Sequence, residues 1–231
     1  MSSIKLKHSS GNSMSIGAPA TNPASDLTLK LPATIGTAGQ VLKNSSTAGT
    51  LEFGDASSGG DYVKLATASS STAVSVIAHE NIDFSVYRAL QFFGGAIPAN
   101  DDEEFNFYWR SGGTECTANT YMTSYNRVFD STPEAEHAVN QGRLQLTMNN
   151  GNGDNQGFYF NIFMFPYASG DELNMGNFIT WQGLTRNASD NFRSYAGVGR
   201  YMTDVAPNGF SFMSDSGNIA HYNYSLYGIK R

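Results

Sequence analysis

The chain has 231 residues, a formal net charge of −6 and an isoelectric point of about 5.1, which excludes an electrostatic nucleic-acid binder. Cys116 is its one cysteine, which excludes an intrachain disulfide and a cysteine-based metal cluster. No run reaches the roughly 20 apolar residues of a membrane span, and no secretory signal follows Met1, so we expect synthesis and folding in a cytoplasm, without membrane insertion.

Residues 1–30 predict an extended attachment arm. Ile4 and Leu6 alternate with lysines, and Leu27 and Leu29 alternate with polar residues, which is the period of a β-strand. Prolines at positions 19, 23 and 32 break any continuous helix. Such a thin segment has too little apolar surface to fold alone, so we expect neighbouring molecules to order it.

Residues 31–60 predict a small β collar followed by a linker. Two short apolar segments, 40–42 and 51–53, are separated by Ser, Thr, Asn and Gly. A two-stranded hairpin is marginally stable in water, so this one needs apolar surface from elsewhere, and identical copies of the chain can supply it. The residues predicted to form a trimer interface are Val41, Leu42, Leu51 and Phe53.

The same segment carries a family resemblance. Residues 31–54 read LPATIGTAGQVLKNSSTAGTLEFG, and this sequence resembles a module of phage tail-fibre-like virion proteins, especially those of marine and cyanobacterial phages. Residues 4–8 and 18–26 resemble the same family. The resemblance implies a virion structural protein of a bacteriophage, made in the host cytoplasm and located in the virion. It also implies a homotrimer that contacts other virion proteins through its N-terminal arm.

Residues 61–231 have the pattern of an antiparallel β-sandwich. Aromatic residues are concentrated here, since Phe53 is the only one before Tyr62. Residues 105–109, 144–148, 210–212 and 222–227 alternate apolar and polar side chains, and glycine-containing turns separate these runs. Residues 158–165 are apolar on nearly both faces, which predicts a central strand covered on each side. We therefore predict an all-β fold whose head is jelly-roll-like.

One short helix is also predicted. Thr132 is a suitable N-cap residue, Pro133 suits the first helical position and Glu134 suits the first turn. The helical pattern ends near Val139. We therefore expect a helix of about two turns inside an otherwise β-rich body.

No catalytic residue, metal ligand or cofactor is predicted, and we expect the protein not to be an enzyme. The densest acidic cluster, residues 101–104, follows Pro98 and precedes a strand, so it predicts a solvated turn. Adjacent carboxylates on an extended chain diverge instead of flanking one glycosidic bond. The four histidines show no zinc-binding spacing, and they are His8, His79, His137 and His221.

The loop at residues 150–154 leaves calcium binding open. Asn150, Asn152 and Asp154 place oxygen ligands at alternate positions, as calcium loops do. The sixth and twelfth positions are Asn155 and Asn161, where a calcium loop has Gly and Glu. The favoured interpretation is a polar hairpin loop.

Two interpretations remain open for three aromatic residues of the body. Trp181, Tyr195 and Tyr201 lie near turn-rich stretches, where they could stack on a sugar, or else fill the core or a subunit interface. Trp109 aligns with Phe105 and Phe107 and is assigned to the core.

The expected function is that of a trimeric fibre- or spike-like appendage whose head binds a host-surface glycan or protein through loops. A capsid decoration or vertex fibre protein is an alternative within the virion class. A stand-alone carbohydrate-binding module is the alternative outside that class. The sequence does not distinguish a tail position from a capsid position.

Overall fold

A computed structural model describes residues 3–7, 13–17, 28–55, 61–129, 132–166, 177–203 and 206–231. The chain divides into two units, Met1–Gly59 and Gly60–Arg231, and each is described by itself. The described residues form strands, turns and loops without a helix. That part of the chain therefore contains no helix able to cross a membrane.

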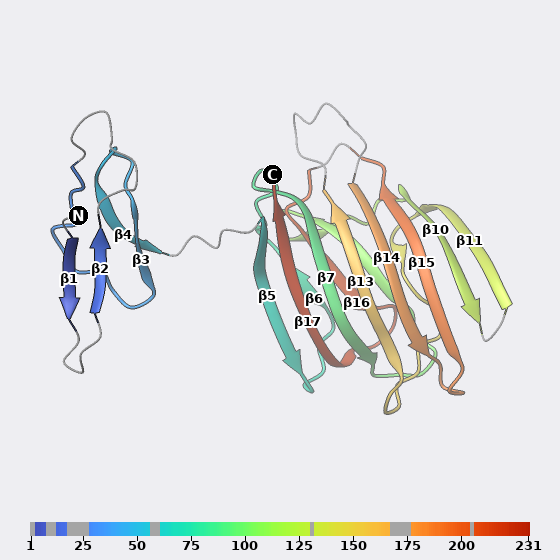
Figure 1. The fold of residues 1–231 in the computed structure, drawn as a ribbon. Helices are drawn as coiled ribbons and strands as arrows, with labels where there is room; N and C mark the ends of the chain where they lie inside the picture. The colour runs from blue at the N-terminus through green and yellow to red at the C-terminus, as the bar shows by residue number, and fades with distance from the viewer. Residues whose placement is uncertain are drawn as a thin grey trace. The chain divides into compact units, whose positions relative to one another are not determined.

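The described residues of the first unit include two short antiparallel strand pairs (Figure 1). Strand β1 (Ser3–Lys7) pairs with β2 (Ser13–Gly17), so the chain doubles back within the segment expected to be an arm. Strand β3 (Gln40–Asn44) pairs with β4 (Leu51–Asp55), which confirms the hairpin predicted there. The Lys30 amide donates to Gly49 O at 2.8 Å, and Lys30 O accepts from the Leu51 amide at 2.8 Å.

The second unit is built on an eight-stranded sheet in the order β11-β10-β15-β14-β13-β7-β17-β5, visible across the body in Figure 1. Its strands, in sequence order, are β5 (Tyr62–Ser70), β7 (Tyr87–Pro98), β10 (Tyr121–Phe129), β11 (Thr132–Gln141), β13 (Gly157–Phe165), β14 (Asn177–Arg186), β15 (Phe192–Tyr201) and β17 (Ile219–Lys230). All neighbours in this sheet are antiparallel.

A smaller five-stranded sheet packs against the first. Its order is β12-β8-β16-β6, with β9 also paired to β8. These strands are β6 (Ile77–His79), β8 (Phe105–Ser111), β9 (Thr114–Glu115), β12 (Leu144–Gln145) and β16 (Gly209–Ser214). One apolar cluster joins residues from both sheets. The prediction of an all-β fold with an antiparallel β-sandwich is therefore confirmed.

Aromatic side chains fill the space between the sheets. Phe92 on β7 lies 4.8 Å from Phe160 and 5.8 Å from Phe212, measured between ring centroids. Phe105 stacks on Phe212 at 4.9 Å, a separation typical of offset aromatic pairs. The core assignment of Phe105, Phe107 and Trp109 is confirmed, because all three are fully buried.

The predicted helix at residues 132–139 is wrong, since this segment forms β11. Its glutamates carry ion pairs across the hairpin: Arg127 Nε lies 2.6 Å from Glu134, and Arg127 Nη2 lies 3.1 Å from Glu136. Pro133 lies on β11, the outermost strand of the sheet, opposite Val128 of β10. On an edge strand the amide hydrogen that proline lacks costs no ladder hydrogen bond. Cross-strand pairing thus overrides the local signals of a helix start.

Strand β13 is central, as predicted, but only one of its faces is covered by the second sheet. Phe158, Phe160 and Ile162 point into the core. Tyr159 exposes 56% of its surface and Phe165 exposes 42%, so the expectation of cover on both sides is wrong for the described residues. The uncovered face of the eight-stranded sheet is where the candidate site lies.

Candidate ligand-binding trough

A broad hollow lies on the outer face of the eight-stranded sheet. Its central part has a volume of about 1070 Å³ and is lined from β7, β10, β13, β14, β15 and β17. Two hollows of about 440 Å³ each adjoin it: one continues it across the strands to β5, and the other lies beside it along β10, β13, β14 and β15. The central hollow shares Asn126, Asn161 and Gln182 with one neighbour, and Phe93 and Asn223 with the other. We call these three connected hollows the trough.

One row of outward-facing residues runs along the trough, perpendicular to the strands. Strand register places its members directly beside one another on seven neighbouring strands. We call this the central row, and from β5 to β10 it consists of Thr67, Ser225, Phe93, Asn161, Gln182, Ala196 and Asn126. Five of these seven side chains carry a hydroxyl or amide group.

More apolar rows border the central row on each side. On one side, Tyr159 pairs with Leu184, and Val128 continues the row on β10 beyond Ser194. On the other side, register aligns Phe163, Thr180 and Val198 on three successive strands. The trough therefore has a polar middle and rims with exposed aromatic and aliphatic surface.

The amide groups of the trough are available for a ligand. Gln91 Nε2 donates to Asn161 Oδ1 at 2.7 Å, which fixes the orientation of the Asn161 amide. Within the described residues, the side chains of Asn126, Gln182 and Asn223 make no hydrogen bond, and all three are exposed. A primary amide can both donate and accept hydrogen bonds, so the trough offers paired donors and acceptors.

The trough carries no formal charge. Among the described residues that line its three hollows, none is Asp, Glu, Lys, Arg or His. Lys64 lies at the β5 end, where its ammonium is 5.8 Å from the Tyr227 ring centroid. The surface suits a neutral ligand, since an ionic ligand would lose hydration without gaining an opposite charge.

The three sugar-stacking candidates from the sequence are core residues. Trp181, Tyr195 and Tyr201 expose 1%, 3% and 4% of their surfaces, so their ring faces cannot stack on a sugar. Trp181 Nε1 donates to Leu146 O at 3.0 Å, and Tyr195 OH donates to Met148 O at 3.1 Å. The 144–148 segment thus satisfies the polar tips of Trp181 and Tyr195, and the burial of all three residues corrects the glycan-contact assignment.

The sequence analysis missed the amides of the central row. Asn161 lies between Phe160 and Ile162 on a strand that was predicted to be apolar on both faces. An amide on the same face as exposed aromatic residues was the signal in that strand. Gln182 and Asn126 could not be grouped with Asn161 from the sequence alone, because only strand order brings them together.

The predicted collar residues expose apolar surface. Leu42 faces Phe53 across the β3–β4 pair, and both are exposed, as is Val41, while Leu51 is half-buried. Ile35 nearby exposes 94% of its surface. The trimer interface stays a prediction.

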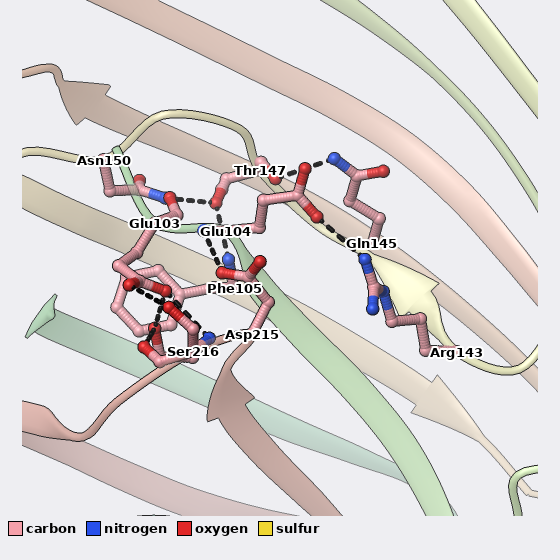
Figure 2. Close-up of polar contacts among 10 residues, drawn as sticks. Glu103, Glu104, Phe105, Arg143, Gln145, Thr147, Asn150, Asp215 and Ser216 are labelled. Atoms are coloured by element: carbon pink, nitrogen blue, oxygen red, sulfur yellow. Dashed lines mark hydrogen bonds and ion pairs between the residues drawn. The ribbon is translucent and has the colours of Figure 1, made fainter. Parts of the chain in front are cut away.

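The acidic cluster at residues 101–104 is only partly a solvated turn (Figure 2). Asp101 and Asp102 are exposed, but Glu103 is buried. The Glu103 carboxylate accepts hydrogen bonds from Ser214 Oγ at 2.9 Å and from the Ser216 amide at 2.9 Å. The expectation of full solvation is therefore wrong for Glu103, because these two partners lie more than a hundred residues further along the chain and only Asn100, at 3.3 Å, is local.

Burial acts to raise the pKa of Glu103, but hydrogen bonds with Asp215, Ser216 and Ser214 outweigh it and lower the pKa to about 2. The pKa of Asp215 is raised by its own burial and by its hydrogen bond and charge interaction with Glu103. Asp215 Oδ1 also accepts from the Glu104 amide at 2.8 Å. The network joins the β7–β8 and β16–β17 turns, and we interpret it as structural.

The 150–154 loop uses its polar groups internally. Asn150 is buried, its Nδ2 donates to Glu103 O at 2.6 Å, and its Oδ1 accepts from Thr185 Oγ1 at 2.6 Å. The Asn152 backbone amide donates to Asp101 Oδ1 at 2.9 Å. These contacts favour the hairpin-loop interpretation over a calcium loop. The described residues include no cluster of three or more His, Cys, Asp or Glu side chains that could hold a metal ion.

His79 is the one histidine with aromatic neighbours among those that the structure describes. Its ring centroid lies 5.3 Å from that of Phe210 and 5.4 Å from that of Tyr224. Burial lowers the pKa of His79, so the neutral form is favoured in the folded protein. This agrees with a structural histidine packed against the core.

Comparisons with known proteins identify no relative of the chain. No protein-family model, no curated protein and no solved structure matches the chain. The functional argument therefore depends on the residues and geometry of the chain itself.

Proposed function

We propose that the protein is a phage virion structural protein, a trimeric fibre- or spike-like appendage whose head binds the host surface through the trough. The uncharged trough across seven strands is the observation that carries this proposal. A surface with free amides and exposed aromatic side chains is suited to binding. In this proposal the rigid sheet, and not the loops, forms the binding surface.

The proposal assigns no catalysis to the head. The buried carboxylate of Glu103 is taken up by hydrogen bonds from the β16–β17 region. The trough itself is lined by amide, hydroxyl, aliphatic and aromatic groups among the described residues, without a carboxylate or an imidazole that could transfer a proton. Binding without turnover is the function that these groups support.

Trimerisation through the collar is supported by its exposed apolar residues. Val41, Leu42 and Phe53 lie on a two-stranded hairpin, which has too little apolar contact to be stable by itself in water. Three copies around one axis would bury these side chains against one another and leave fewer strand edges open. Residues 1–30 would then connect the trimer to other virion proteins.

The trimer is tested by sedimentation equilibrium of the full-length chain. We expect a mass three times the 24.9 kDa of one chain, and we expect Leu42→Asp to give single chains because a carboxylate cannot be buried in an apolar interface. Val198→Asp, on the outer face of the head, is the matched control and should remain trimeric. A wild-type chain that sediments as a monomer at all concentrations would remove the collar from the proposal.

The virion assignment is tested on particles of the phage that encodes the chain. Antibodies against the head, viewed by immunoelectron microscopy, should label a tail fibre or spike. Label at the capsid vertices or over the capsid would instead identify a vertex fibre or decoration protein. A chain absent from purified particles would overturn the virion assignment and favour the stand-alone carbohydrate-binding module, which the trough also supports.

A further inference from the structure

We infer that the ligand of the trough is an uncharged, extended polysaccharide that lies across the strands along the central row. The inference rests on the proposed function, in which the trough is the surface that contacts the host. It adds the chemical class of the ligand and its direction on the sheet. Three properties of the trough support it: charge, repeat and cross-section.

The charge argument concerns every described residue of the trough. None of the residues lining the three hollows is ionisable to a charged form near neutral pH. A sulfated or carboxylated polymer would lose hydration in the trough and find no cation among the residues that line it. The free amides of Asn126, Gln182 and Asn223 instead match hydroxyl groups, which donate and accept like amides.

The repeat argument concerns the spacing of the central row. Its seven residues lie on consecutive strands, which are about 4.8 Å apart. A sugar ring in an extended polysaccharide occupies a similar length. Successive sugars along the row would therefore meet successive side chains, five of the seven polar, with Asn161 and Gln182 on adjacent strands at the centre.

The cross-section argument concerns the rims. Sugar rings have apolar C–H faces and polar edges, so they favour a polar row beside exposed aromatic surface. Tyr159 is among the most exposed aromatic residues of the described chain, and Phe93 is exposed within the central row itself. Leu184 opposite Tyr159 continues the apolar rim along the same direction.

The test is binding of the full-length chain to soluble polysaccharides in native affinity gels. Neutral probes are hydroxyethyl cellulose, mannan, galactomannan and dextran; anionic probes are alginate and chondroitin sulfate. The variants are Gln182→Ala, which removes a free amide from the centre of the row, and Gln182→Glu, which adds a charge at similar size. Asn218→Ala is the matched control, because Asn218 is an exposed amide in the β16–β17 turn, outside the trough.

We expect the wild-type chain to bind at least one neutral polymer. Gln182→Ala should weaken this binding about tenfold, and Gln182→Glu should weaken it further. Asn218→Ala should leave it unchanged. Equal unfolding midpoints for all variants would show that folding is retained. Binding only to anionic polymers would overturn the inference, as would neutral binding that Gln182→Ala leaves unchanged, or no binding to any neutral polymer. The proposed function is contradicted by different results. These are absence of the chain from purified virions, or binding of the chain to host cells that Gln182→Ala does not reduce.

Discussion

The two faces of the eight-stranded sheet are made by the same strands but have opposite chemistry. On β7, Phe92 is fully buried against the second sheet while Phe93 exposes 38% of its surface to the trough. On β13, Phe160 and Ile162 point inward, and Asn161 between them points outward. The inner face is held by packing, and the outer face carries amides, such as those of Asn126 and Gln182, that make no hydrogen bond within the described residues. This separation leaves the outer face free to vary for binding.

The largest expected effect tests this separation on two adjacent residues. Phe92→Ala should lower the free energy of unfolding by about 3–5 kcal/mol, because it opens a cavity among Phe160, Phe210 and Phe212. Phe93→Ala should cost about 1 kcal/mol or less, since its ring is partly in water already. Urea unfolding of both variants measures the difference. Similar losses would mean that the outer face is part of the core.

An intermediate effect concerns the buried carboxylate at the end of the sandwich. The pKa of Glu103 falls from its ordinary 4.5 to about 2 in the folded protein, so its stabilising contribution is present above pH 4.5 and is lost as the pH falls toward 2. Glu103→Gln should therefore cost about 1–3 kcal/mol at pH 7, and less at pH 2.5. Urea unfolding at both pH values measures this change.

Asp215 provides the control for that pH dependence. Its raised pKa favours the protonated form in the folded protein, so it acts in the opposite direction to Glu103 as the pH falls. Asp215→Asn removes the ionisable carboxyl group and can still accept from the Glu104 backbone amide, so it should not produce the loss of stability with falling pH that Glu103 produces. A Glu103→Gln deficit that is the same at both pH values would contradict the assigned charge of Glu103.

The sequence predicted the inner face well because burial requires a strict period of two. The inward side of β17, with Tyr222, Tyr224 and Leu226, follows directly from alternation. Alternation does not say which face meets the second sheet when both are partly apolar, as on β13. It also cannot foresee long-range pairings, and residues 132–139 became a strand through Arg127 and the β10–β11 hairpin.

The candidate site was less predictable than the fold for the same reason. Trp181 and Tyr195 were judged by the turns near them in sequence, yet their burial depends on the 144–148 segment, which bonds their polar tips. The central row depends on strand order, and four of the six strand pairings along it join strands that are not consecutive in the sequence. Residue types alone could indicate a binding surface but not its position.

The smallest expected effect separates two amides of the trough from each other. Gln91→Ala removes the 2.7 Å hydrogen bond to Asn161 and should cost about 1 kcal/mol of unfolding free energy. Asn126→Ala removes an amide without a partner among the described residues, so its effect should stay within about 0.5 kcal/mol. Thermal and urea unfolding together resolve this difference. If Asn126→Ala were the costlier change, the Asn126 amide would contribute to folding. The residues of the outer face would then stabilise the fold as well as bind a ligand.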